Sequence, residues 1–263
     1  MCENVCDCFF DNAKEIFAKR LPNTRLFLYE SIGSTNTEAK RYAEENPSFE
    51  NAVFIARSQS AGRGRLGRSF LSGEGGLYLS YLFRPELSCE RTLLITVYSA
   101  VSLCEVIEEM TGAAPKIKWV NDVFLEGRKI AGILTEGAVA PGAESLRYAV
   151  VGIGVNVGKV DFPEELTDIA SDIESATGVR PDIGELAVRL AEKLCRFDPS
   201  CREEYMRRYR ERSLVIERRV KVIAAGGEYY ATVRSIDDDG ALHVIRDDGK
   251  FVRLISGEIS IKL

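Results

Sequence analysis

The sequence lacks a long hydrophobic run. The longest weakly charged stretch, residues 92–104, lies between Arg91 and Glu105 and is shorter than the roughly 18 to 20 apolar residues that a membrane span needs. The N-terminus, MCENVCDCFF, carries acidic residues where a secretory signal has a basic region, and no long apolar stretch follows it. We therefore expect a cytoplasmic protein that does not use a membrane.

Histidine, the commonest metal ligand, is also scarce. His243 is the only histidine, and the seven cysteines, an odd number, are scattered through 263 residues. Disulfide scaffolds are short and dense in cysteine, so free thiols are expected here. Cys2, Cys6 and Cys8 are close enough to suggest a metal clip, but no fourth ligand lies nearby. We expect no tightly bound metal.

An excess of positive charge is missing as well. The formal net charge is -5, which argues against a protein whose whole surface follows nucleic acid. Any anion site must therefore be local. Arg63, Arg65 and Arg68 fall within six residues that contain no acid, and this cluster is one such place.

Hydrophobic periodicity predicts the elements of the first four-fifths of the chain. Apolar runs predict strands at 26–29, 52–57, 77–83, 117–120, 129–134 and 148–157. Helical spacing predicts helices at 11–21, 35–46, 92–111, 182–197 and 200–212. Thr35 and Glu38 fit a capping box that opens the second helix. Since strands and helices do not alternate strictly, we expect an α+β fold with a mixed, largely antiparallel sheet flanked by helices.

The sequence pattern changes from helical spacing to short β-rich runs near Ser213. Short β-rich runs then alternate with turn clusters such as residues 237–240 and 247–249. Roughly five strands in this short segment predict a small β-barrel. We expect a short N-terminal helix in residues 1–25, a large domain in 26–212 and a barrel domain in 213–263.

The most informative segment is residues 59–68, Gln-Ser-Ala-Gly-Arg-Gly-Arg-Leu-Gly-Arg. Its glycines let the backbone approach an anion, its N–H groups can cradle phosphate, and its arginines are always ionised. This suits a reaction that joins two anions, although a merely solvated basic loop has the same composition. The G-x-G-x-x-G spacing matches a dinucleotide fingerprint, but more glycines follow where that fingerprint must open a helix.

A second segment reads Lys-Trp-Val-Asn-Asp at 118–122 and is followed by Arg-Lys-Ile-Ala-Gly-Ile-Leu at 128–134. We expect a hairpin with Asn121 and Asp122 at its turn. These residues could hold a nucleotide or Mg²⁺, or serve only as turn formers. Lys129 precedes small residues that would let a ligand lie against the strand, so its side chain could reach an anion.

Two further segments each have two interpretations. Gly152 and Gly154 interrupt an apolar strand, which indicates either a bulge or the close approach of a ligand. The Ser-Thr-Asn run at 34–36 can cap a helix or contact a ligand.

In this order, the four segments resemble the biotin protein ligase family (biotin–acetyl-CoA-carboxylase ligases), from about Leu26 to the C-terminus. The resemblance implies a catalytic domain like that of class II aminoacyl-tRNA synthetases, with a C-terminal SH3-like β-barrel. It also implies ATP, Mg²⁺ and biotin, an acceptor lysine in a biotin carboxyl carrier protein or domain, and possible homodimers. Too few residues precede Leu26 for the helix-turn-helix unit of repressor members, so we expect the ligase-only form.

The resemblance further implies which residues form the site. Lys129 and Arg65 would be catalytic. Biotin would meet Ser34, Thr35, Gln59, Gly62, Arg63, Arg65, Lys129, Gly132, Gly152 and Gly154. ATP or the adenylate would meet Arg65, Arg68, Phe70, Lys118, Trp119, Asn121, Asp122, Lys129 and Asn156, with Asp122 also a candidate Mg²⁺ ligand. Val120 stands where proline is common and Phe70 where some members have tryptophan, although Phe70 still offers an aromatic face.

Two other functions stay open at this point. A lipoate-type ligase would use the same adenylation chemistry on a different acid, and the Gly-Arg-Gly-Arg run favours biotin only by resemblance. A non-enzymatic nucleic-acid-binding module would use the arginine cluster and the terminal barrel. The negative net charge counts against that module.

Overall fold

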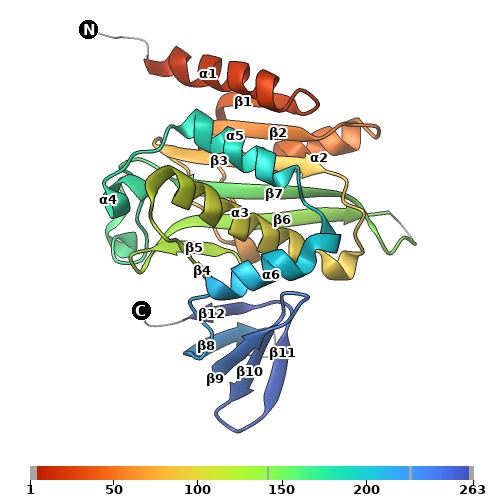
Figure 1. Ribbon diagram of the computed structural model, residues 1–263, viewed down its shortest axis with the longest axis vertical. Coiled ribbons are helices and arrows are strands. Elements are labelled where there is room, and N and C mark those ends of the chain that lie inside the picture. The colour runs from red at the N-terminus through yellow and green to blue at the C-terminus, as the bar shows by residue number, and fades with distance from the viewer. Residues whose placement is uncertain (1–4, 141, 225–226, 261–263) are drawn as a thin grey trace.

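Two β-sheets organise the protein (Figure 1), in a computed structural model that describes residues 5–140, 142–224 and 227–260. The larger sheet has the strand order β1-β2-β3-β7-β6-β5-β4. Its strands are β1 (Arg25–Ile32), β2 (Ala52–Gln59), β3 (Gly76–Phe83), β4 (Lys116–Lys118), β5 (Asp122–Leu125), β6 (Arg128–Val139) and β7 (Leu146–Asn156). Only the β1–β2 pair in it is parallel, which confirms the mixed, largely antiparallel sheet.

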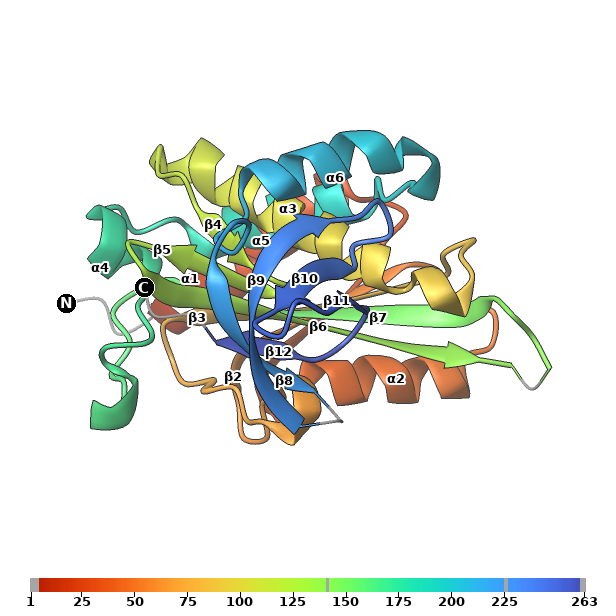
Figure 2. The same cartoon turned by 90° about the horizontal axis from the view of Figure 1, so that it is seen from below.

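Helices cover both faces of this sheet. They are α1 (Val5–Arg20), α2 (Thr35–Glu45), α3 (Leu93–Thr111), α4 (Ile173–Thr177), α5 (Ile183–Leu194) and α6 (Arg202–Glu211). Seen from below, α2 lies on one face and α3, α5 and α6 lie on the other (Figure 2). Because strand side chains alternate between faces, Val53 joins the large core cluster and Phe54 the smaller one beside α2. The inner strand β3 is therefore buried along its whole length.

One predicted hairpin is wrong in its pairing. The strand that returns after Asn121 is β5, and β6 pairs with β5 and β7 instead of β4. Glu126 and Gly127, both with positive φ, form the tight turn between β5 and β6 that two left-handed residues allow. The short apolar run of β5 lies between two turns, so its sequence gave little sign of a separate strand.

The predicted capping box at the start of α2 is also wrong. Ser34 is the N-cap and its side chain makes no capping hydrogen bond. The backbone N–H of Thr35 donates to Gln59 Oε1 at 2.8 Å, and Thr35 Oγ1 donates to the same oxygen at 3.1 Å. A side chain from β2 thus satisfies the start of the helix, and Thr35 is turned toward β2 and β3.

The second sheet has the order β11-β10-β9-β8-β12 and is antiparallel throughout. Its strands are β8 (Arg219–Ala224), β9 (Gly227–Ile236), β10 (Leu242–Arg246), β11 (Phe251–Leu254) and β12 (Glu258–Ser260). The five predicted strands are confirmed. The edge strands β11 and β12 are not paired with each other in the described residues, so the hydrogen bonds do not close a barrel.

The two sheets are joined by a shared core and by polar contacts. Val120 of the first part and Val220 of the second belong to one buried apolar cluster. Trp119, the single tryptophan, is 3% exposed and donates from Nε1 to Gly240 O at 2.9 Å. The place of the small sheet beside the large one, visible in Figure 1, is thus fixed by packing as well as by hydrogen bonding.

The cysteines with described side chains, Cys89, Cys104, Cys195 and Cys201, are free thiols, as expected. The N-terminal cysteines considered above as a metal clip lie outside the residues whose side chains are described. Within the described part of the chain, no cluster of three or more His, Cys, Asp or Glu side chains could hold a metal. No helix there is both long and apolar enough to cross a membrane.

Candidate active site

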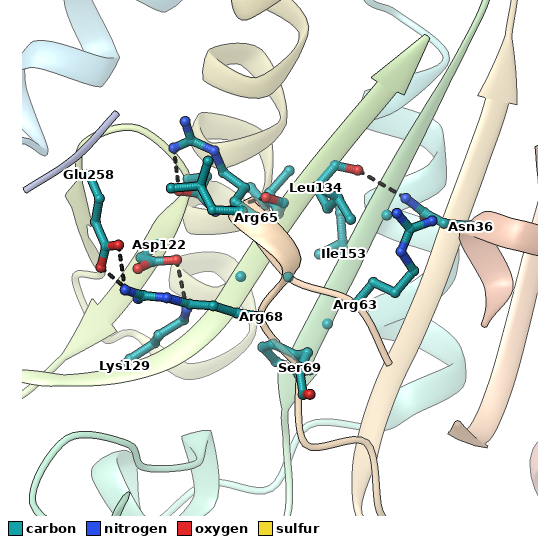
Figure 3. A pocket seen from close by; sticks show the side chains of 18 of the residues that line it. Asn36, Arg63, Arg65, Arg68, Ser69, Asp122, Lys129, Leu134, Ile153 and Glu258 are labelled. Carbon is teal, nitrogen blue, oxygen red and sulfur yellow. Dashed lines mark hydrogen bonds and ion pairs between the residues drawn. The ribbon is translucent and has the colours of Figure 1, made fainter. Parts of the chain in front are cut away.

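Most of the candidate residues line one cavity (Figure 3). The cavity is bounded by the N-terminus of α2, the 62–70 loop, strands β5 to β7 and strand β12. The candidates that line it are Ser34, Thr35, Gln59, Arg63, Arg65, Arg68, Phe70, Lys118, Trp119, Asn121, Asp122, Lys129, Gly132, Gly152 and Gly154. Gly62 and Asn156 do not line it. Asn156 is buried and donates from Nδ2 to Ser171 O at 3.0 Å, so a direct contact with a nucleotide in this cavity is not expected.

The basic loop forms a small hairpin over the cavity. Gly64 N donates to Arg68 O at 2.7 Å, and Phe70 N donates to Gly62 O at 3.0 Å. Leu66 and Gly67 form its tip with φ of 56° and 77°. No long helix follows, so the local structure excludes the dinucleotide-binding interpretation of the glycine spacing.

Each of the three loop arginines is held by a different set of partners. Arg65 points inward, where it donates to Asn121 Oδ1 and to Gly257 O, both at 3.2 Å. Arg68 pairs with Glu258 at 2.6 Å (Figure 3). Arg63 lies 3.4 Å from Glu136. Burial lowers the pKa of Arg65, although an arginine still remains charged at neutral pH. The loop is therefore more than a solvated basic segment, because its arginines are held by specific partners.

Cations outnumber anions at this end of the cavity. Lys129 Nζ pairs with Asp122 Oδ1 at 2.7 Å, and Lys118 lies beside the same group. Burial lowers the pKa of Lys118, while Asp122 opposes that shift. Four lining cations, Arg65, Arg68, Lys118 and Lys129, thus face two lining carboxylates, Asp122 and Glu258. The imbalance favours an anionic ligand.

The middle of the cavity has a flat glycine floor. Gly132 of β6 and Gly154 of β7 are paired across the strands. A Cβ atom at Gly154 would lie 2.5 Å from Phe70 Cε1, and one at Gly132 would lie 3.2 Å from Phe70 Cε2. The register of β7 is unbroken at Gly152 and Gly154, which excludes a bulge and leaves close approach as their role.

The other end of the cavity is polar, and the charge of Arg63, which lines it, is balanced by the carboxylate of Glu136 at 3.4 Å. Gln59 Oε1 accepts from Thr35, and Gln59 Nε2 donates to Ser72 Oγ at 3.0 Å. Ser34 and Asn36 are buried beside them. The cavity therefore fits a ligand with a neutral hydrogen-bonding head, a thin apolar middle and an anionic end.

Some lining residues were not named individually as ligand contacts from the sequence, although Asn36, Gly64 and Leu66 lie in segments that were singled out. They are Asn36, Gly64, Leu66, Ser69, Tyr78, Ile133, Leu134, Ile153, Gly257, Glu258 and Ile259. Asn36 and Gly64 adjoin predicted residues and could have been included on that ground. Gly257 and Glu258 come from the small sheet, and no local pattern ties them to the large one.

Comparison with known proteins decides the family. Residues 28–156 match the model of the biotin/lipoate A/B protein ligase family, and residues 215–262 match that of the biotin protein ligase C-terminal domain. The chain is 31% identical over 247 residues to the bifunctional ligase/repressor BirA of Bacillus subtilis, covering 90% of this chain and 74% of that protein. The chain belongs to the biotin/lipoate A/B protein ligase family.

Other members of this ligase family agree with that placement. The biotin–[acetyl-CoA-carboxylase] ligase of Mycobacterium tuberculosis is 29% identical, over 86% of this chain and 85% of that protein. The structure of the Aquifex aeolicus biotin protein ligase with biotin and ATP matches with a TM-score of 0.71 and 27% identity, over 90% of this chain and 97% of that chain. The match extends over both sheets, because it covers nearly the whole chain.

Proposed function

We propose that this ligase activates biotin with ATP as biotinyl-5′-AMP and then transfers biotin to a lysine of a biotin carboxyl carrier protein or domain. The observation that carries the proposal is the division of the cavity. Its neutral polar end suits the ureido head of biotin, the glycine floor suits the ring and chain, and the cationic end suits a carboxylate and a phosphate. Lipoate has no polar head group to satisfy Thr35 and Gln59, so the polar end favours biotin.

The reaction needs two steps, because an amine cannot displace oxygen from a free carboxylate, whose oxygen is a poor leaving group. In the first, the biotin carboxylate oxygen attacks the α-phosphorus of ATP, a new P–O bond forms and pyrophosphate leaves. In the second, the acceptor lysine attacks the acyl carbon, a C–N bond forms and AMP leaves. The first step brings two anions together, so it depends on positioning and on charge stabilisation.

The cavity residues divide this work between them. Lys129 and Arg65 would stabilise charge where the carboxylate meets the α-phosphate. Ser34, Thr35 and Gln59 would hold the ureido group, and Gly62 and Arg63 would hold the loop over biotin. The nucleotide would meet Arg68, Phe70, Lys118, Trp119, Asn121 and Asp122.

Mg²⁺ fits this site as an ion that arrives with ATP. Two carboxylates, Asp122 and Glu258, line the cationic end, and Mg²⁺ is usually held by one or two carboxylates together with substrate phosphates. Asp122 would be its protein ligand. The ion would neutralise part of the phosphate charge.

We also propose the division of the chain that the sequence suggests. A short helix would occupy residues 1–25, the catalytic domain 26–212 and the C-terminal domain 213–263. The last of these contributes Gly257 and Glu258 to the cavity wall, so the catalytic domain alone would have an incomplete site.

Loop closure makes a prediction about proteolysis. The side chains of Arg63 and Arg68 are 49% and 63% exposed, and a bound adenylate should draw the loop inward and exclude water. We expect biotin plus ATP to slow tryptic cleavage at both arginines by about tenfold or more, since local opening controls such cleavage. Cleavage at a distant exposed arginine such as Arg207 should not change. Equal cleavage with and without ligands would contradict closure.

Product analysis tests the proposed function. The protein is incubated with ATP, Mg²⁺ and either biotin or lipoate, and the acyl-adenylate is sought by mass spectrometry. Biotinyl-5′-AMP should form and lipoyl-5′-AMP should form at most weakly. A dominant lipoyl product would mean that the chain is a lipoate ligase.

A further inference from the structure

Asn36 lies on the cavity wall (Figure 3), and both polar atoms of its amide are hydrogen-bonded. Its Nδ2 donates to Leu134 O at 3.2 Å and to Glu136 Oε2 at 2.9 Å, and its Oδ1 accepts from Ser80 Oγ at 2.6 Å. An amide has its donors on one side and its acceptor on the other. These partners therefore fix which way the amide of Asn36 faces.

The sheet beneath Asn36 is shaped to receive it. Ser80, Gly152 and Leu134 are aligned across the neighbouring strands β3, β7 and β6. A Cβ atom at Gly152 would collide with the Asn36 amide. The absence of a side chain at Gly152 thus lets the Asn36 amide lie across β7, between the Ser80 hydroxyl on β3 and the Leu134 carbonyl on β6.

Ser80 holds a second residue of the cavity wall. Its side chain is fully buried, and its hydroxyl also lies 2.8 Å from Thr35 Oγ1. The Ser80 hydroxyl has a single proton and two acceptors within reach, Thr35 Oγ1 and Asn36 Oδ1, so it contacts both side chains and donates to one of them at a time. Thr35 Oγ1 in turn donates to Gln59 Oε1, so hydrogen bonds link Ser80 through Thr35 to Gln59 at the polar end of the cavity.

Glu136 connects the same wall to the loop. One carboxylate oxygen accepts from Lys40 Nζ at 2.7 Å and lies 3.4 Å from Arg63, and the other accepts from Asn36. Burial alone would raise the pKa of Glu136, but the hydrogen bonds from Lys40 and Asn36 outweigh it and lower the pKa. An ionised carboxylate therefore joins α2, β6 and the ligand loop.

We propose that Ser80 and Glu136, which do not line the cavity, are positioning residues for biotin recognition. They hold Thr35 and Asn36 in one orientation, so that the ureido head meets hydrogen-bonding groups already in place. This inference rests on the proposed function. Because the network lies at the polar end, away from Lys129 and Lys118, it affects biotin affinity and leaves ATP affinity and the chemical step nearly unchanged.

Three variants test this role. Ser80→Ala removes the hydroxyl that contacts both Thr35 and Asn36. Glu136→Leu removes one of the two acceptors of Asn36 Nδ2 and leaves the other, Leu134 O. Each should raise the Kd for biotin, measured by calorimetry without ATP, by about tenfold, the usual effect of leaving one buried polar group unpaired. Glu136→Gln keeps the shape and an acceptor oxygen, so it should restore part of the affinity. KM for ATP and kcat should stay within about twofold in all three.

Ser99→Ala is the matched control, since Ser99 is also fully buried and its hydroxyl donates to a backbone oxygen of its own helix. It should leave the Kd for biotin unchanged. Ser80→Cys keeps the volume with a weaker donor and serves as the folded substitute if Ser80→Ala is unstable. An unchanged biotin Kd in folded variants, or a joint rise in biotin Kd and ATP KM, would overturn the positioning role. If the unaltered chain binds lipoate and no biotin, the proposed function fails instead, and this inference with it.

Discussion

Replacing Lys129 with alanine is expected to reduce the rate of biotinyl-5′-AMP formation by about 10²–10³, or roughly 2.7–4 kcal/mol of transition-state stabilisation. The side chain lies at the cationic end of the cavity, where it pairs with Asp122 at 2.7 Å. In the first step, negative charge gathers where the carboxylate and the α-phosphate meet. Removing a fixed positive charge from that place costs most when the charges are close and water is excluded.

The fold should survive this substitution. The Lys129 side chain is 30% exposed, and Asp122 keeps Arg65 and Lys118 as neighbouring cations. Lys129→Arg should rescue only in part, because a planar fork does not replace a compact ammonium between two anions. Lys221→Ala is the matched control, since it removes a half-exposed lysine paired with Glu228 on the small sheet, and adenylation should be unaffected.

Two assays separate the steps for Lys129→Ala. Pyrophosphate release reports adenylation, and acyl transfer is followed from purified biotinyl-5′-AMP. We expect a smaller loss of rate in acyl transfer, since in that step a neutral amine, and not a second anion, approaches the acyl group. A folded variant that forms the adenylate at nearly the parent rate would show that Lys129 is not the central catalytic residue.

Replacing Gly154 with valine is expected to abolish measurable biotin binding while leaving the protein folded. Gly154 pairs with Gly132 on the cavity floor, and a Cβ atom added there would lie 2.5 Å from Phe70 Cε1. A branched side chain at this point fills the space between the floor and the loop. Valine is favoured in strands, and the steric clash is with the loop, which can move aside, so stability should change only modestly. The loss of biotin affinity should exceed 100-fold.

Gly33→Val provides the comparison for this variant. Gly33 has no atom within 4 Å of the place a Cβ would occupy, so the substitution adds the same atoms outside the cavity. Biotin affinity should stay within about threefold of the parent, as for other surface changes. If Gly154→Val binds biotin as tightly as Gly33→Val does, then the glycine floor does not receive the ligand.

The parts of the site with an unusual local composition could be predicted from the sequence. Residues 62–68 place glycines between arginines, and 118–122 and 129–132 place charged groups beside small or turn-forming ones. Such runs are rarely needed for packing alone, so they stand out. The glycines of β7 could be noticed too, but only the unbroken strand register decided between a bulge and a close approach.

The rest depends on contacts between distant segments. Ser80 and Glu136 look like an ordinary strand serine and an ordinary glutamate until β3, β6 and α2 are brought together. Glu258 reaches Arg68 only because the small sheet docks beside the loop. The capping prediction for Thr35 failed for the same reason, since Gln59 of another strand takes the role that a local cap would have.

The most direct test of the central claim is biotin-dependent exchange of labelled pyrophosphate into ATP, measured without any acceptor protein. If the cavity joins biotin to AMP as a separate first step, exchange should require biotin, should not require an acceptor, and should fall by about 10²–10³ in Lys129→Ala. Exchange that appears without biotin, or only after an acceptor is added, would contradict the two-step account.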